Sequence, residues 1–267
     1  MSQLQAATIL ITGAGGGFGQ ELTRQLLAKG SQLILTDHPA ANLPAMLPSL
    51  DQAHRDKPSQ VLACLEIDLA DAVGCETLYS ATQQLNVIPD VVINNAGMAL
   101  LGNMVDLPAD RWENMLQINL LTPMRLSRLF AKDMMARKQG HIVNISSLAG
   151  WIATPGLAAY AASKYGLRGF SEGLRYELVP HNVRVTTVYP FFSRTPLLSA
   201  PRFGRFAELE RDLPPALTTD PRKIMSKTIR AIERNQNEVF PDQFALVGQW
   251  LKRYFPAALG WLGRLNP

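Results

Sequence analysis

The sequence predicts a single α/β domain, residues 1–267, built on a doubly wound, mostly parallel β-sheet with helices on both faces. Short apolar runs of strand length alternate with amphipathic stretches of helical length along the chain. No internal repeat and no linker interrupts this alternation, and 267 residues suit one large domain. A content of 47% hydrophobic and 18% charged residues is typical of a globular protein.

The first predicted unit is a strand over 7–12, a glycine-rich turn and a helix over 20–29 that Gly30 ends. In this setting a glycine turn presents backbone N–H groups and a helix N-terminus to a phosphate. A plain tight turn is the alternative. The turn follows the pattern Thr-Gly-x-x-x-Gly-x-Gly, with its fixed positions at Thr12, Gly13, Gly17 and Gly19.

A second strand over 33–36 ends at Asp37. An acidic residue about 20 positions beyond the turn can accept hydrogen bonds from an adenosine ribose, and it would repel a 2′-phosphate. Positions 16, 36 and 38 offer no Arg or Lys to bind such a phosphate. This favours NAD over NADP, with a helix or turn cap as the alternative role of Asp37.

The next two strands are predicted over 61–67 and 90–93, after a helix with loose ends over 39–57. Asp68 follows the first of these strands and can either hold the edge of an adenine ring or cap the helix predicted over 72–85. The other strand runs into Asn94, Asn95, Ala96 and Gly97, where small and amide residues allow close approach of the backbone to a cofactor. A structural turn is the alternative there.

Two helices are predicted over 108–117 and 120–138, with Asn119 at the break between them. An asparagine at such a break can hold a water molecule or cap a helix. The remaining strands are expected over 141–145, which ends at Ser146-Ser147, over 183–188, which ends at Tyr189-Pro190, and at a short edge over 238–240. A helix over 158–179 lies between the first two.

Tyr160 and Lys164 lie one helical turn apart on that helix, so both can point into one cleft. A nearby ammonium lowers the pKa of a phenol, and the phenol can then exchange a proton with a carbonyl or alcohol oxygen. Ser147 can donate a hydrogen bond to the same oxygen. A surface pair is the alternative for Tyr160 and Lys164, but six candidate residues fall at the carboxyl ends of strands, where such sheets bind ligands. These are Thr12, Asp37, Asp68, Asn94, Ser147 and Pro190.

With these motifs in order, residues 7–200 resemble the short-chain dehydrogenase/reductase family. The resemblance implies a Rossmann-like domain that binds a nicotinamide dinucleotide and moves a hydride between the nicotinamide and an alcohol or ketone carbon. It makes Tyr160 the general acid/base and Ser147 the donor that positions the oxygen. Lys164 would lower the pKa of Tyr160 and bind the nicotinamide ribose, and Asn119 would support a water relay. The implied cofactor-binding set is Thr12, Gly13, Gly17, Phe18, Gly19, Asp37, Asp68, Leu69, Asn94, Asn95, Ala96, Gly97, Tyr160, Lys164, Pro190 and Thr195.

The chain departs from the family pattern after the sixth strand, where Phe191 follows Pro190 in place of the usual glycine. An aromatic ring there can reshape the pocket. It also motivates an alternative function, a dinucleotide-binding regulator or scaffold without catalysis.

The expected substrate is a hydrophobic alcohol or ketone, because the candidate pocket walls are largely apolar. Packing in the core is the alternative for several of these residues. Residues 191–219 are expected to form a substrate lid, in which Arg194, Arg202 and Arg205 can meet an acidic group or remain solvated. The candidate walls are Met98, Leu100, Trp151, Phe191, Phe192, Leu197 and Leu198, with Ser147 and Tyr160 at the reacting oxygen.

The C-terminal extension, residues 242–267, is aromatic and basic and contains no acidic residue after Asp242. It can lie on a membrane face as an amphipathic helix. Packing on the sheet or on a partner subunit is the interpretation we favour. The resemblance implies a homodimer or homotetramer through the helices over 120–138 and 158–179.

Charge and cysteine content narrow the possible partners, metal content and cellular location of the protein. Basic residues are scattered and the net charge is +4, so no nucleic-acid partner is expected. Cys64 and Cys75 show neither a disulfide framework nor metal-ligand spacing, which predicts reduced thiols, no metal and a cytoplasmic location. Neither a signal peptide nor an apolar stretch of membrane-spanning length is apparent.

Overall fold

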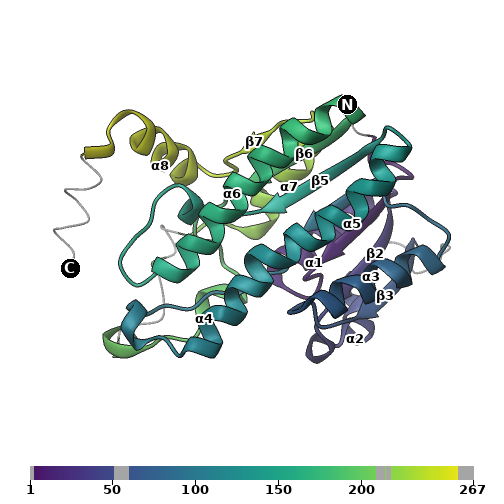
Figure 1. Ribbon diagram of the computed structural model, residues 1–267. Coiled ribbons are helices and arrows are strands. Elements are labelled where there is room, and N and C mark those ends of the chain that lie inside the picture. The colour runs from purple at the N-terminus through teal and green to yellow at the C-terminus, as the bar shows by residue number, and fades with distance from the viewer. Residues whose placement is uncertain (1–2, 51–59, 209–213, 215–217, 258–267) are drawn as a thin grey trace.

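Seven parallel strands form one sheet in the computed structural model, in the order β3-β2-β1-β4-β5-β6-β7 (Figure 1). The structure describes residues 3–50, 60–208, 214 and 218–257. The strands are β1 Thr8–Thr12, β2 Gln32–Asp37, β3 Val61–Glu66, β4 Val91–Asn94, β5 Gly140–Ile145, β6 Val183–Val188 and β7 Glu238–Val239.

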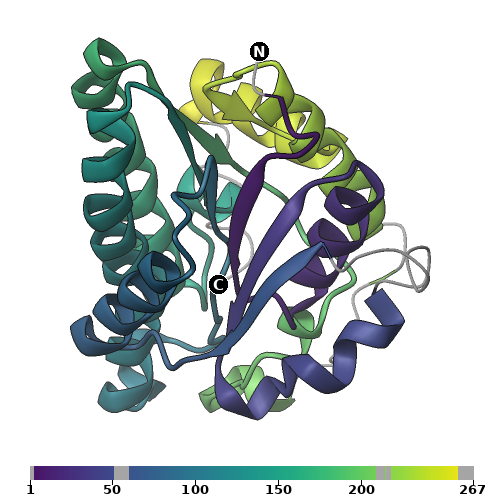
Figure 2. The same cartoon turned by 90° about the vertical axis from the view of Figure 1, so that its right-hand side faces the viewer.

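Helices cover both faces of this sheet, as Figure 2 shows with the sheet between two helical layers. One layer contains α1 Gly17–Ala28, α2 Leu43–Leu50 and α7 Pro221–Glu233. The other contains α3 Ala72–Gln84, α5 Thr122–Ala136 and α6 Ala158–Leu178. Two further helices, α4 Ala109–Leu116 and α8 Gln243–Tyr254, lie outside these two layers. The predicted doubly wound α/β fold is confirmed.

The central strands of the sheet bury both of their faces, which explains why they appear in the sequence as apolar runs rather than as alternating patterns. All five residues of β1 are buried. Ile9 and Ile11 pack toward α1 and α7, whereas Leu10 packs toward the layer of α3 and α5. Because the chain order reverses between β1 and β4, the carboxyl ends of these two strands form the crevice in which such sheets bind ligands.

The predicted helix break at Asn119 is wrong, because a π-helical turn, Gln117–Leu121, joins α4 directly to α5. Pro123 has no amide hydrogen, so the carbonyl of Asn119 cannot receive the usual bond from four residues later. The wider turn accommodates this missing donor and keeps the helix continuous.

Two other expectations differ from the structure. The helix predicted over 39–57 is a 3-10 turn, Pro39–Ala41, followed by α2, and residues 51–57 of that prediction lie outside the described residues. Helix α7 was not predicted. In the described parts of the chain we find no helix that combines the length and apolarity of a membrane span.

Candidate active site

The glycine turn after β1 packs closely on the segment that follows β4. Gly13 has a φ of +65°, and a Cβ there would lie 2.7 Å from the Cα of Ala96. Gly16 caps α1 without a side-chain hydrogen bond, so the first-turn N–H groups of this 12-residue helix have no side-chain acceptor. N–H groups without a side-chain cap, next to a glycine-rich turn, fit the diphosphate of a dinucleotide.

The residues after β4 hold this turn in place. Thr12 Oγ1 accepts hydrogen bonds from the N–H groups of Asn95 and Ala96, both at 3.0 Å. The Asn95 side chain donates in turn to the carbonyl oxygens of Thr12, at 2.9 Å, and Gly13, at 3.0 Å. Asn95 and Ala96 therefore position the turn through its backbone, in addition to any contact with a cofactor.

Asp37 lies at the end of β2, beside the turn, as predicted. Its carboxylate accepts hydrogen bonds from the N–H of Gly15 and the N–H of His38, both at 2.7 Å. This arrangement fixes a negative charge at the position where an adenosine ribose would lie.

Asp68 is a neighbour of Asp37 across the end of β3, with its carboxylate 3.8 Å from the ring of His38. It accepts a hydrogen bond from the N–H of Ala70. The alternative in which Asp68 caps the following helix is wrong, because the cap of α3 is Asp71, which accepts from the N–H of Gly74. The half-exposed carboxylate of Asp68 is accessible at the adenine end of the crevice.

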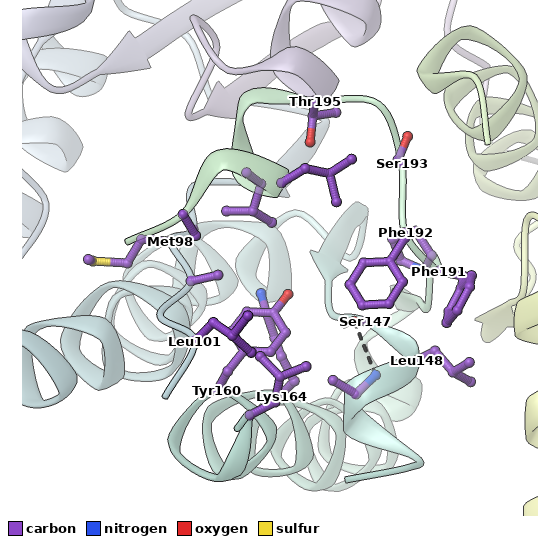
Figure 3. Close-up of a pocket in the computed structure, with 18 of the residues that line it drawn as sticks. Met98, Leu101, Ser147, Leu148, Tyr160, Lys164, Phe191, Phe192, Ser193 and Thr195 are labelled. Carbon is purple, nitrogen blue, oxygen red and sulfur yellow. Dashed lines mark hydrogen bonds between the residues drawn. The ribbon is translucent and has the colours of Figure 1, made fainter. Parts of the chain in front are cut away.

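Tyr160 and Lys164 both point from α6 into a cavity, where they are 8% and 5% exposed (Figure 3). The Lys164 ammonium lies 5.7 Å from the centre of the Tyr160 ring and donates to the Ile145 carbonyl at 3.1 Å. Ser147, at the end of β5, lines the same cavity and accepts a hydrogen bond from the N–H of Ala149. The surface-pair alternative is therefore excluded.

Burial controls the ionisation of both groups. It raises the pKa of the Tyr160 phenol to about 12, although a hydrogen bond with Ser147 lowers it. It also lowers the pKa of Lys164 to about 8. Loss of solvation is the main cause of the raised pKa of Tyr160, and the lowering of this pKa by Lys164 stays a prediction.

Asn119 is fully buried at the π-helical turn, close to Lys164. Its side chain accepts from the N–H of Met98 and donates to the carbonyl of Met98, both at 2.9 Å, and it donates to Ser163 Oγ at 3.1 Å. Both amide hydrogens therefore hold the loop segment after β4 against α6. A relay water remains a prediction, and the Asn119 backbone carbonyl is the acceptor best suited to it.

The cavity has a volume of about 450 Å³ and is bounded by three loops. The loop at residues 201–203 pairs with Leu101, whose N–H donates to the Pro201 carbonyl at 3.0 Å and whose carbonyl accepts from the N–H of Phe203 at 2.8 Å. Figure 3 shows Phe191, Phe192 and Thr195 on the side opposite Tyr160. The walls are predominantly apolar and include Met98, Leu100, Leu101, Leu148, Ile152, Leu157, Phe191, Phe192, Leu197, Leu198 and Phe206.

Part of the predicted lid closes against the glycine turn. A Cβ at Gly17 would lie 2.7 Å from Thr195 Cγ2, so Thr195 lies directly over the start of α1. Pro190 and Phe18 line the cavity nearby. Residues 209–213 and 215–217 of the predicted lid, and 258–267 of the predicted C-terminal extension, lie outside the described residues.

Trp151 does not line the cavity, which corrects its prediction as a pocket wall. It packs edge-on against Tyr189 and Phe240, and the Arg168 guanidinium lies 3.3 Å from its ring centre. The Trp151 ring faces away from the cavity because it is buried in a separate aromatic cluster with Tyr189 and Phe240.

Two residues of the predicted cofactor set have side chains that face away from the crevice. Asn94 donates to Asn144 Oδ1 at 2.8 Å and to Ser127 Oγ at 3.4 Å, inside the layer under α5. Leu69 packs in the core under α3, and only its backbone lies at the end of β3. Strand geometry, which alternates side chains between the two faces, directs Asn94 to the face of Val92.

Sequence reasoning missed Asp242, which supports the loop after β6. Its buried carboxylate accepts from the N–H of Phe191 at 2.9 Å and, as the cap of α8, from the N–H of Ala245 at 2.8 Å. The Phe191 ring packs on Phe244 of the same helix. An aspartate directly before an apolar run was the available signal of a helix cap. Ile152 and Phe206 were also missed as walls.

Comparisons with known proteins agree with this geometry. The sequence model of the family described as short chain dehydrogenase matches residues 7–202. A "Dehydrogenase/reductase SDR family protein 7-like" of Anopheles gambiae is 27% identical over 97% of this chain and 82% of its own length. A "Dehydrogenase/reductase SDR family member 7B" of Bos taurus is 34% identical over 72% of this chain and 59% of its own length. The match thus covers about three fifths of the bovine relative.

Solved structures show the same fold. A short-chain dehydrogenase/reductase of Burkholderia phymatum in complex with NAD has a TM-score of 0.82, with 21% identity over 97% of this chain and 96% of that one. A short-chain dehydrogenase of Sphingobium yanoikuyae in complex with NADPH has a TM-score of 0.78, with 24% identity over 97% of this chain and 95% of that one.

Proposed function

The chain belongs to the short-chain dehydrogenase/reductase family, and on that premise we propose that it moves a hydride between NAD(H) and the secondary alcohol or ketone carbon of a hydrophobic substrate. Family membership makes it an oxidoreductase that binds NAD(P). The observation that carries the finer proposal is the meeting of Tyr160, Ser147 and Lys164 in an apolar cavity of about 450 Å³ beside the glycine turn.

The dinucleotide, when bound, supplies or accepts the hydride at its nicotinamide ring. Because the pKa of Tyr160 is about 12, its phenol carries a proton at neutral pH and can donate it to a carbonyl oxygen. The Ser147 hydroxyl hydrogen-bonds to the same oxygen and fixes its position. Lys164, with a pKa of about 8, is mainly an ammonium at pH 7 and stabilises the phenolate that remains after the transfer.

The preference for NAD(H) rests on Asp37. Its carboxylate is held at the end of β2 by the N–H groups of Gly15 and His38, where it can accept hydrogen bonds from a ribose diol. A 2′-phosphate at the same place would meet this negative charge and would be disfavoured.

The hydrophobic substrate class rests on the cavity walls. Phe191, Phe192 and Leu198 come from the lid, and Met98 and Leu101 come from the opposite loop. A substrate rich in hydroxyl groups would bury them here with few hydrogen-bond partners, which costs free energy. We also propose that residues 191–219 act as the lid, and that a homodimer or homotetramer forms through α5 and α6, which static light scattering would test.

Initial rates of NADH and NADPH oxidation, measured with apolar ketones of increasing size and with dihydroxyacetone as a polar control, test the proposal. We expect turnover of apolar ketones, little with dihydroxyacetone, and a preference for NADH of about tenfold or more, the equivalent of ~1.4 kcal/mol. A preference for NADPH would contradict the role of Asp37. Dinucleotide binding without turnover of any ketone would instead favour the non-catalytic regulator that Phe191 suggests.

A further inference from the structure

Helix α8 is apolar on two opposite faces, and only one of them is covered. On the inner face a Cβ at Gly248 would lie 2.8 Å from Leu148 Cδ2 and 3.2 Å from Ile152 Cδ1, so this face packs closely on the cavity wall. Phe244 packs on Phe191 in the same region. The helix is therefore docked firmly on the body of the protein by one side.

The opposite side, the α8 outer face, consists of Leu246, Val247, Trp250 and Tyr254, which are 51%, 57%, 51% and 59% exposed. Their spacing places them in one stripe along the helix. The Trp250 ring lies 5.7 Å from the Tyr254 ring and 5.2 Å from the ring of Phe255, which is also exposed. A contiguous apolar stripe of this kind on a surface helix marks an interaction site. Figure 1 shows α8 projecting from one end of the molecule, where this face is accessible.

A row of cations adjoins the α8 outer face. Lys227 and Arg230 on α7 and Arg234, its C-cap residue, are exposed at helical spacing and form the α7 cation stripe. All three line a surface depression of about 330 Å³ together with Leu246, so the α7 cation stripe and the α8 outer face meet there. The carboxylate of Glu238 also lines the depression, where it accepts a hydrogen bond from the hydroxyl of Tyr189.

The charge of α8 has the same sign. Lys252 and Arg253 occupy its last turn, and the sequence from position 243 to 267 contains no aspartate or glutamate. If a second copy of this chain docked by the same face about a two-fold axis, the α7 cation stripes of the two copies would lie close together, and their like charges would repel. The surface of an anionic bilayer fits better, because it can contact both the α7 cation stripe and the α8 outer face.

We propose that the α8 outer face and the α7 cation stripe bind the surface of a bilayer that contains anionic phospholipids. Tryptophan and tyrosine prefer the interface between headgroups and acyl chains, and lysine and arginine at that depth interact with lipid phosphates. Because the inner face of α8 packs on Leu148 and Ile152, the bilayer lies next to the wall of the apolar cavity. This reverses the interpretation favoured from sequence, in which the extension only packs against protein.

Flotation of the full chain with vesicles of phosphatidylcholine alone, or of phosphatidylcholine with phosphatidylglycerol, tests the proposal without any need for catalysis. The wild type is expected to float with the anionic vesicles and to dissociate as salt is raised. The double variant Val247→Ser/Trp250→Ser is expected to bind at least about tenfold more weakly, because it removes apolar area from the interface. Its matched control is Val73→Ser/Val105→Ser, which removes two exposed apolar side chains elsewhere.

The variant Lys227→Gln/Arg230→Gln/Arg234→Gln tests the electrostatic part. Each cation near an anionic surface contributes about fivefold in binding, so the triple variant is expected to bind on the order of 100-fold more weakly.

The charge-matched control Arg111→Gln/Lys138→Gln/Arg184→Gln, whose side chains are exposed outside α5, α6, α7 and α8, is expected to bind like the wild type. Circular dichroism verifies that each variant is folded. The proposal is overturned if the wild type does not float with anionic vesicles, or if the Val247/Trp250 variant floats as well as the wild type. It is equally overturned if light scattering shows a dimer that this variant dissociates, because the face is then a subunit interface.

Discussion

Replacing Lys164 by methionine should change how the stability of the protein depends on pH. Burial lowers the pKa of Lys164 from its usual 10.5 to about 8. A pKa difference of one corresponds to about 1.4 kcal/mol, so keeping this ammonium buried costs the folded state about 3 kcal/mol at neutral pH. Methionine fills a similar volume and carries no charge.

The sign of the pH dependence follows from how many protons the folded and the unfolded protein bind. Between about pH 8 and pH 10.5 the unfolded chain keeps a proton on Lys164 that the folded protein has released, so the free energy of unfolding rises with pH in this window. From about pH 7 to about pH 9.5 the wild type should gain about 2 kcal/mol relative to Lys164→Met. At about 2.1 cal/mol/K of unfolding entropy per residue, the gain corresponds to a relative shift of about 4 °C in Tm.

Urea unfolding followed by circular dichroism at both pH values, without added dinucleotide, measures this difference. The matched control is Lys223→Met, which replaces an exposed lysine on α7 and should change the free energy of unfolding equally at both pH values. Other titrating groups are common to all three proteins and cancel in the comparison. If the free energies of unfolding of wild type and Lys164→Met change with pH by the same amount, within about 0.5 kcal/mol, the claim that Lys164 is buried as an ammonium is refuted.

Three further substitutions test other parts of the site. Asp37→Ser removes the charge at the ribose position and should raise the ratio of kcat/KM for NADPH to that for NADH about tenfold; an unchanged ratio in initial-rate measurements would show that Asp37 does not select the cofactor. Asn119→Ala leaves the buried N–H and carbonyl of Met98 without their partners and should lower the free energy of unfolding by about 1–3 kcal/mol in urea titrations; an unaltered unfolding midpoint would argue against the clamp. Phe191→Gly removes a cavity wall and should lower kcat/KM for apolar ketones about tenfold while NADH affinity by fluorescence titration stays the same; equal rates would mean that substrate does not touch the ring.

The strands and the residues at their carboxyl ends could be predicted because buried parallel strands are continuous apolar runs. Helix α7 was also predictable, because Met225, Ile229 and Ile232 recur at helical spacing after Asp220, which caps the helix. The π-helical turn was not, since Pro123 permits either a new helix start or a widened turn, and only packing decides between them.

That Tyr160 and Lys164 share one face of a helix could be predicted from their spacing, whereas their ionisation could not. Residues four apart on a helix must share a face, so Tyr160 and Lys164 were bound to point together. Their pKa values depend on how much of the rest of the chain excludes water, which the sequence pattern does not state. Trp151 was misplaced for a related reason, because an aromatic residue near a site can pack in an adjoining cluster instead of the wall.

The proton transfer assigned to Tyr160 is tested most directly by comparing Tyr160→Phe with the wild type in NADH binding and in single-turnover reduction of an apolar ketone. Phenylalanine keeps the ring and removes the hydroxyl, so the NADH affinity should stay within about threefold while the reduction slows by about 10²–10⁴-fold. A Tyr160→Phe variant that reduces the ketone as fast as the wild type would contradict the assignment.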